Sequence, residues 1–219
     1  MSSQKNQVSY PLLYLVTDRD LALGRSLLEV VAQAVEGGAN IVQLREKSLD
    51  TRLFIEEAIA IKEYLKPRGI PLIINDRVDV ALAVGADGVH VGQKDMPYAL
   101  ARKLLGPQAI IGLSVETYED LLQAESLDVD YLGVGPVYPT STKTDHKGFF
   151  WKEEGLRWAR EHSRHRLVAI GGINETNALE VVKTGVDGIA VVSAIVSASD
   201  PRQAARRLFQ VLTNKEAQV

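Results

Sequence analysis

The segment from Gly133 to Asp145, GVGPVYPTSTKTD, places hydroxyl and charged side chains directly after an apolar run. Its polar half contains Thr140, Ser141, Thr142 and Lys143 in succession. Hydroxyl groups and an ammonium group can bind the oxygens of a phosphate, so this loop is a candidate anion-binding site. An ordinary surface loop can have the same composition, and the segment alone does not separate the two interpretations.

Carboxylates and cations follow other apolar runs of the chain. Asp76 and Asp95 each come at or shortly after the end of such a run, and Arg45 and Lys47 follow another. Carboxylates alone would repel an anionic ligand, whereas carboxylates with cations beside them suggest a divalent metal ion. Mg²⁺ is typically held by one or two carboxylates, with substrate phosphates completing its coordination. We therefore expect Mg²⁺ at Asp76 and Asp95, although either aspartate alone could simply cap a helix.

The segment VAIGGI carries a second candidate anion site. It places Gly171 and Gly172 after an apolar run. Glycine turns let backbone N–H groups approach an anion closely, and such a turn is a common phosphate site in α/β barrels. The same glycines could also mark a turn that only tolerates positive φ.

The four histidines carry weaker signals. His90 lies within an apolar run and is expected to be a packed core residue rather than a base. His146, His162 and His165 have polar neighbours and are expected at the surface. None of the four is therefore a candidate for the chemistry at this stage.

Eight short runs rich in valine, isoleucine and leucine must position the candidate residues. They span residues 12–17, 41–46, 71–76, 88–93, 110–115, 131–137, 167–173 and 189–195. Between them lie amphipathic segments such as 26–38 and 51–69, in which apolar residues recur at helical spacing and glycine marks the end. Nearly all-apolar strands that alternate with helices indicate a parallel sheet covered by helices.

Eight such units in one chain favour an α/β fold, the (β/α)8 TIM barrel, over the alternative of a doubly wound sheet. In this barrel the active site is built at the carboxyl ends of the strands. The cations, carboxylates, hydroxyls and glycine turns would then converge on one barrel mouth. That convergence is stronger support for a phosphate-binding site than any one residue.

The composition is typical of one globular domain. The chain has 219 residues, 46% of them apolar, so we expect a single domain over 1–219 with flexible ends at about 1–8 and 214–219. A net charge of −3 gives no basic excess for nucleic acid or an anionic membrane. The absence of cysteine excludes disulfides and thiolate chemistry. No signal-peptide pattern or membrane span is visible, which predicts a cytoplasmic protein, and a homo-oligomer stays open.

Seven motifs together resemble the thiamine-phosphate synthase family. They are LYLVTD, VQLREK, LIINDRVDVALAVGADGVHVGQKDMP, IIGLSVET, GVGPVYPTSTKTD, VAIGGI and GIAVVSAI, and they extend from about residue 12 to residue 195. The family joins 4-amino-2-methyl-5-hydroxymethylpyrimidine diphosphate to hydroxyethyl-methylthiazole phosphate and releases pyrophosphate. The resemblance therefore implies a transferase with two small phosphorylated substrates.

The resemblance also implies roles for individual residues. The pyrimidine diphosphate would bind Gln43, Leu44, Arg45, Glu46, Lys47, Asn75, Ser114 and Lys143. The thiazole phosphate would bind Thr140, Ser141, Thr142, Gly172, Val192 and Ser193. One Mg²⁺ per subunit would bind Asp76 and Asp95, and the catalytic residues would be Ser114, Lys143, Arg45 and Lys47.

The implied mechanism is a dissociative substitution. The aminopyrimidine can push electrons toward its exocyclic methylene, so the C–O bond can break before the new C–N bond forms. Ser114 would hold the pyrimidine, Lys143 would reach the leaving diphosphate, and residues 144–150 would form a lid.

One residue departs from the family's pattern. Family members and their relatives often have histidine two residues after the serine, where this chain has Glu116. A related barrel, the thiazole tautomerase, uses a histidine in this region as its acid and base, so Glu116 argues against that activity. The alternatives are such a tautomerase, another phosphate-binding barrel isomerase, and a non-catalytic ligand-binding relative.

Overall fold

The strands form a closed parallel barrel. The computed structural model describes residues 11–140 and 148–214. Its strands are β1 (Leu12–Val16), β2 (Ile41–Leu44), β3 (Leu72–Asn75), β4 (Gly88–Val91), β5 (Ile110–Val115), β6 (Tyr131–Val134), β7 (Leu167–Ile170) and β8 (Gly188–Val191). They pair in chain order, and β8 closes the ring on β1. The prediction of a (β/α)8 barrel is confirmed.

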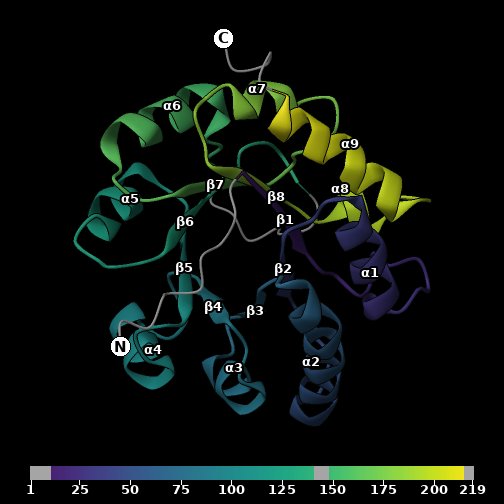
Figure 1. The fold of residues 1–219 in the computed structure, drawn as a ribbon. Coiled ribbons are helices and arrows are strands. Elements are labelled where there is room, and N and C mark those ends of the chain that lie inside the picture. Colours follow the sequence, from purple (N-terminus) through teal and green to yellow (C-terminus); the bar gives the residue numbers. More distant parts are fainter. Residues whose placement is uncertain (1–10, 141–147, 215–219) are drawn as a thin grey trace.

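Helices surround this ring of strands (Figure 1). They are α1 (Leu27–Gly37), α2 (Thr51–Leu65), η1 (Lys66–Arg68), α3 (Val78–Val84), α4 (Tyr98–Leu105), α5 (Tyr118–Ala124), α6 (Lys152–His162), α7 (Ala178–Val182), α8 (Ser193–Val196) and α9 (Pro201–Thr213). Local signals mark the ends of some of them. Ser26 caps α1 by accepting from Glu29 N, and Gly38 ends it at φ 117°.

Period-two alternation along the strands divides the apolar residues into two cores. One set points outward and packs against the helices, as Leu13 and Leu15 of β1 do, in the same core as Leu208 of α9. The other fills the barrel interior and includes Leu12, Tyr14, Val16, Ile41, Ile73, Ile110, Tyr131, Val168 and Ala190. The interior set therefore carries the side chains that can form the floor of a site at the barrel mouth.

Most of the predicted elements extend past the observed ones, as three of them illustrate. β2 ends at Leu44, and β8 ends at Val191 because residues 193–196 form the short helix α8. Helix α2 ends at Leu65, and residues 66–68 form the turn η1 before Gly69 adopts φ 64°. Pro67 explains the early end, since proline lacks the N–H that a continuing helix requires.

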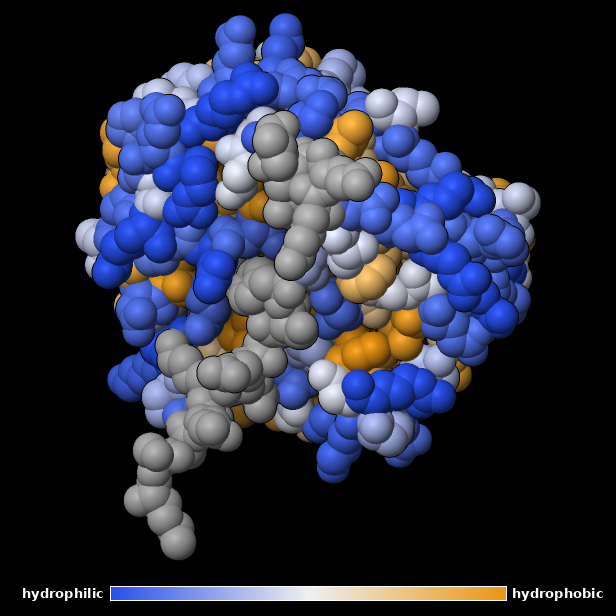
Figure 2. All heavy atoms as spheres, turned by 45° about the horizontal axis from the view of Figure 1, so that its top comes forward, coloured by the Kyte–Doolittle hydropathy of each residue, from blue (hydrophilic) through white to orange (hydrophobic). Residues whose placement is uncertain are grey.

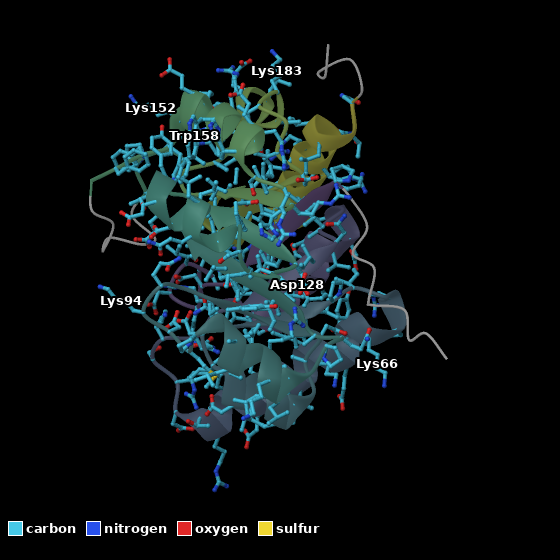
Figure 3. All side chains as sticks on the ribbon, turned by 90° about the vertical axis from the view of Figure 1, so that its left-hand side faces the viewer. Lys66, Lys94, Asp128, Lys152, Trp158 and Lys183 are labelled. Carbon is cyan, nitrogen blue, oxygen red and sulfur yellow. The ribbon has the colours of Figure 1, made fainter. Side chains whose placement is uncertain are left out.

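On the face shown in Figure 2 the surface is mostly hydrophilic, with apolar residues in small separate groups. Lys152 of α6 and Lys183 lie on the outside of the molecule (Figure 3), whereas Trp158 of α6 is partly buried. Among the residues that the structure describes, no helix is long and apolar enough to cross a bilayer.

Candidate active site

A cavity of about 610 Å³ opens at the carboxyl ends of the strands, and all eight strands contribute to its wall. Most of the predicted site residues line it. They are Gln43, Arg45, Lys47, Asn75, Asp76, Asp95, Ser114, Thr140, Gly172, Val192 and Ser193. Ser141, Thr142 and Lys143 lie outside the described residues. The barrel thus brings together side chains that are far apart in the sequence.

The two cations after β2 are paired with carboxylates from the neighbouring strands. Arg45 Nη1 donates to Asp18 Oδ2 after β1, at 2.9 Å. Lys47 Nζ donates to Asp76 Oδ2 after β3, at 2.6 Å. Thr17 Oγ1 also accepts from the Arg45 backbone N–H at 3.0 Å, which ties the end of β2 to the end of β1. Both cations are therefore held at the cavity rather than dispersed in solvent.

Two predicted pyrimidine diphosphate residues do not bring their side chains to the cavity. Leu44 is fully buried in the core between barrel and helices, because it alternates with the inward-facing Gln43. The Glu46 carboxylate accepts from Arg19 Nη2 at 2.9 Å, on the β1 side. Neither side chain is among the described residues that line the cavity.

Asp76 and Asp95 lie together at the ends of β3 and β4. Asp76 has a φ of 60°, and Arg77 N–H donates across it to the Asn75 carbonyl at 2.7 Å. This is a γ-turn with a left-handed central residue, a strained conformation that aspartate and asparagine tolerate better than most residues. Asp95 Oδ2 accepts from the Gly92 backbone N–H at 2.7 Å.

Neither aspartate is a helix cap. The N-cap residues of α3 and α4 are Arg77 and Pro97, and neither helix has a side-chain cap hydrogen bond. Burial raises the pKa of Asp95, the Gly92 N–H opposes that rise, and the Asp76 carboxylate beside it adds to it. A carboxylate pair that is costly to ionise together is a favourable place for a cation.

This donor set fits Mg²⁺. The Asp76 carboxylate already binds one cation, because it accepts a hydrogen bond from the Lys47 ammonium. In the part of the chain that the structure describes, no three acidic or histidine side chains gather into a metal-binding group. Two carboxylates suffice when substrate phosphate oxygens and water supply the remaining ligands, which is how Mg²⁺ usually binds.

The glycine loop after β7 forms another part of the wall. Gly171 and Gly172 have φ values of 101° and 68°. The Asn177 side chain holds this loop, because its Nδ2 donates to Gly172 O at 2.9 Å and its Oδ1 accepts from Asn174 N at 2.8 Å. A Cβ on Gly172 would meet Pro139 O at 2.7 Å. The loop therefore packs against the segment that leads to Thr140.

A chain of polar side chains crosses the barrel interior beneath the cavity. Gln43 Nε2 donates to Tyr14 Oη at 3.0 Å, and Tyr14 Oη lies 2.8 Å from Tyr131 Oη. Tyr131 Oη lies 2.9 Å from His90 Nδ1, and His90 Nε2 lies 2.8 Å from Ser114 Oγ. The chain connects β2 to β5 through the middle of the barrel.

Comparison with known proteins identifies the family. The family model described as thiamine monophosphate synthase matches residues 13–195. The chain belongs to the thiamine monophosphate synthase family. It is 57% identical over 200 residues to a thiamine-phosphate synthase of Albidiferax ferrireducens, and the matched region covers 91% of each protein. It is 53% identical over 202 residues to one of Vibrio campbellii, which covers 91% of this chain and 97% of that protein.

A solved structure of a relative has the same fold. It is described as thiamine phosphate pyrophosphorylase from Pyrococcus furiosus, with a TM-score of 0.85 and 42% identity over 95% of this chain and 97% of that one. The prediction of a family member, and of a transferase, is confirmed by these matches. The roles of individual residues stay predictions.

Sequence reasoning does not find Tyr14 and Tyr131 in this member of the thiamine monophosphate synthase family. Both lie in otherwise aliphatic strands and face the barrel interior. A polar residue at an inward position of an apolar strand is the signal that could have found them, since a buried hydroxyl needs a hydrogen-bond partner.

The structure corrects two expectations about the histidines. His90 lies in β4 but is not packed only among apolar groups, because it lines the cavity and both ring nitrogens have polar partners. His165 is only 8% exposed, so its prediction as a surface residue is wrong; Nε2 lies 3.2 Å from a carbonyl of α5. His162 is exposed, as predicted, and His146 lies outside the described residues.

Proposed function

We propose that this chain is a thiamine-phosphate synthase that joins the aminopyrimidine diphosphate to the thiazole phosphate. The products are thiamine monophosphate and pyrophosphate. The observation that carries the proposal is that one cavity has two different polar regions, each suited to an anion. The carboxylates and Lys47 lie at the ends of β2, β3 and β4, and the Gly171–Gly172 loop lies after β7, across the eight-stranded ring.

The carboxylate side is suited to the diphosphate. Asp76 and Asp95 would hold one Mg²⁺, which when bound would supply positive charge to the diphosphate oxygens. Arg45 and Lys47 would add charge-assisted hydrogen bonds to the same group. Each cation would exchange its present carboxylate partner, at least in part, for a phosphate oxygen. Lys143, outside the described residues, is proposed from the sequence to contact the leaving group.

The glycine side is suited to a phosphate monoester. Gly171 and Gly172 adopt positive φ, which glycine accommodates without strain, so this turn can direct backbone N–H groups toward an anion. Thr140 and Ser193 line the same part of the cavity and offer hydroxyl groups. Backbone N–H groups and hydroxyls bind a phosphate without requiring a metal ion. We expect the thiazole phosphate here, with Ser141 and Thr142 contributing from the loop.

The reaction needs charge stabilisation more than a strong base. The bond between the methylene carbon and the diphosphate oxygen breaks, and its electron pair leaves with pyrophosphate. The thiazole ring nitrogen then donates its lone pair to the pyrimidine cation, and the C–N bond forms. Arg45 and Lys47 stabilise the charge that develops on the leaving group, Ser114 holds the pyrimidine, and the phosphate site brings the nitrogen close.

A direct assay tests the proposal. Purified protein is incubated with both substrates and Mg²⁺, and thiamine monophosphate and pyrophosphate are measured; equal amounts of the two are expected. Omitting either substrate is the control. A tautomerase or isomerase would convert a single phosphorylated substrate without a divalent ion, and a non-catalytic relative would bind both substrates without turnover. Either result would replace the synthase assignment.

A further inference from the structure

The strongest unexplained feature is the polar chain in the barrel interior. Tyr14, Gln43 and Tyr131 are buried, yet these polar side chains occupy positions that a barrel usually fills with apolar ones. Burying polar groups is costly unless each one is hydrogen-bonded. Hydrogen bonds join every neighbouring pair of this series of side chains, and the series ends on Ser114, which lines the cavity.

The barrel makes room for this chain with two glycines. A Cβ on Gly112 would lie 2.3 Å from Tyr131 Oη and 2.5 Å from His90 Nδ1, where the phenol and the imidazole meet. A Cβ on Gly133 would lie 2.9 Å from His90 Cε1. Strands β5 and β6, the next two after the strand of His90, are therefore shaped around its ring. The two glycines therefore indicate that the packing of His90 and Tyr131 is a specific feature of the barrel and not an accidental contact.

The number of hydrogens that each side chain can donate decides which group is the donor in each hydrogen bond of this series. Tyr14 Oη accepts from the Gln43 amide, so its own hydrogen is directed to Tyr131 Oη. Tyr131 then directs its hydrogen to His90 Nδ1, which must carry a lone pair. The proton of a neutral His90 consequently lies on Nε2 and is donated to Ser114 Oγ.

The consequence concerns the serine. A hydroxyl that accepts from His90 has its own hydrogen left for another acceptor. We propose that Tyr14 and Tyr131 are positioning residues that hold His90 as the Nε2–H tautomer, so that Ser114 presents its hydroxyl hydrogen to an acceptor on the substrate. In an aminopyrimidine the acceptor is a ring nitrogen. The substrate part of this inference rests on the proposed synthase function, whereas the tautomer does not.

The opposite direction is the competing arrangement. If Gln43 turned its amide oxygen toward Tyr14, every hydrogen bond in the chain would reverse. His90 would then carry its proton on Nδ1, and Ser114 would donate to Nε2 and accept from the substrate. The two arrangements differ in one measurable property, the protonated ring nitrogen of His90.

The first experiment reads that property in the free protein. Protein labelled with ¹⁵N-histidine is studied by NMR, and the His90 signals are assigned by their loss in His90→Gln. We expect a protonated Nε2 and an unprotonated Nδ1. A protonated Nδ1, alone or together with Nε2, would overturn the proposal. The measurement needs no substrate, so it stands even if the synthase assay fails.

The second experiment removes the Tyr131 hydroxyl and so interrupts the series of hydrogen bonds between Gln43 and Ser114. Tyr131→Phe keeps the ring but removes the hydroxyl, so His90 loses the donor to Nδ1. We expect a mixture of tautomers and a fall in kcat of roughly ten- to a hundred-fold, the range that misplacement of a positioned group can cause. KM for the thiazole phosphate should stay unchanged. Tyr14→Phe tests the same chain one step earlier and should act in the same direction.

A matched variant controls for loss of a tyrosine hydroxyl in general. Tyr64 lies on α2, away from the cavity, and its hydroxyl only approaches a backbone carbonyl, at 3.5 Å. Tyr64→Phe should change neither the tautomer nor kcat. An unaltered tautomer and unaltered kcat in both Tyr131→Phe and Tyr14→Phe would reduce the tyrosines to packing residues and refute the proposal.

Discussion

Lys47 Nζ lies 2.6 Å from Asp76 Oδ2, across the ends of β2 and β3. The lysine side chain is 55% exposed, so water screens the pair and its contribution to stability is small. The pair therefore has little value for the fold. Lys47 lines the cavity, and we propose that it serves an anionic ligand there.

Lys47→Met should separate these two roles. We expect a change in the free energy of unfolding of at most about 1 kcal/mol, as for other exposed ion pairs. KM for the pyrimidine diphosphate should rise and kcat should fall, because a charge on the leaving group is lost. Denaturant unfolding and steady-state kinetics measure the two effects. A large loss of stability with normal kinetics would make Lys47 a structural residue.

Asp76→Asn and Asp95→Asn test the metal site. Asparagine tolerates the left-handed φ of residue 76, and neither aspartate caps a helix, so the fold should stay intact. Turnover should fall on the order of 10²-fold or more, and the Mg²⁺ concentration for half-maximal rate should rise. Wild-type protein treated with a chelator should lose activity and regain it with Mg²⁺. Full activity without any divalent ion would contradict the proposed site.

Asp95→Asn should also raise the stability of the metal-free protein at neutral pH. Burial and the Asp76 carboxylate raise the pKa of Asp95, so its ionised form is less favourable in the folded chain than in the unfolded chain. This penalty is present above the folded pKa, shrinks as the pH falls through that value, and is absent below the unfolded pKa. The melting temperature of the variant should exceed that of wild type at neutral pH, and the difference should disappear in acid. A difference that grows in acid would have the wrong sign.

Gly172→Val tests the thiazole phosphate site. A side chain at φ 68° is strained, and its Cβ would meet the backbone of Pro139 and the side chain of Tyr138 within 3 Å. We expect binding of the thiazole phosphate to weaken much more than binding of the pyrimidine diphosphate, as measured by isothermal titration with each ligand. Equal weakening of both would argue against separate phosphate sites.

Asn177→Ala tests the same loop without adding a side chain to it. The variant removes the donor to Gly172 O and the acceptor for Asn174 N, so the glycine turn should loosen. KM for the thiazole phosphate should rise by roughly ten-fold, since each lost hydrogen bond is worth about 1 kcal/mol. Asn177→Asp keeps the acceptor and loses the donor, and it should give an intermediate stability with an equally weak phosphate site. No change in KM in either variant would show that the loop does not need Asn177.

Much of the fold follows from local pattern. The eight apolar runs predict the strands because side-chain type and period-two alternation are properties of the segment itself. Ser26, Gly38 and Pro67 likewise act on their own helices. The motifs and the position of Asp76 and Asp95 at the ends of their strands also predict the cavity, because parallel strands end at one mouth.

Other properties depend on how distant segments meet. Lys47 and Asp76 are 29 residues apart, and Tyr14 and Tyr131 are 117 residues apart, so only the closed ring of strands decides that they touch. The inward position of Gln43, which turns Leu44 toward the helices, depends on how β2 sits in the ring. Sequence alone determined which residues could do chemistry; the tertiary structure decided which of them share hydrogen bonds, because register between neighbouring strands is set by packing around the whole barrel.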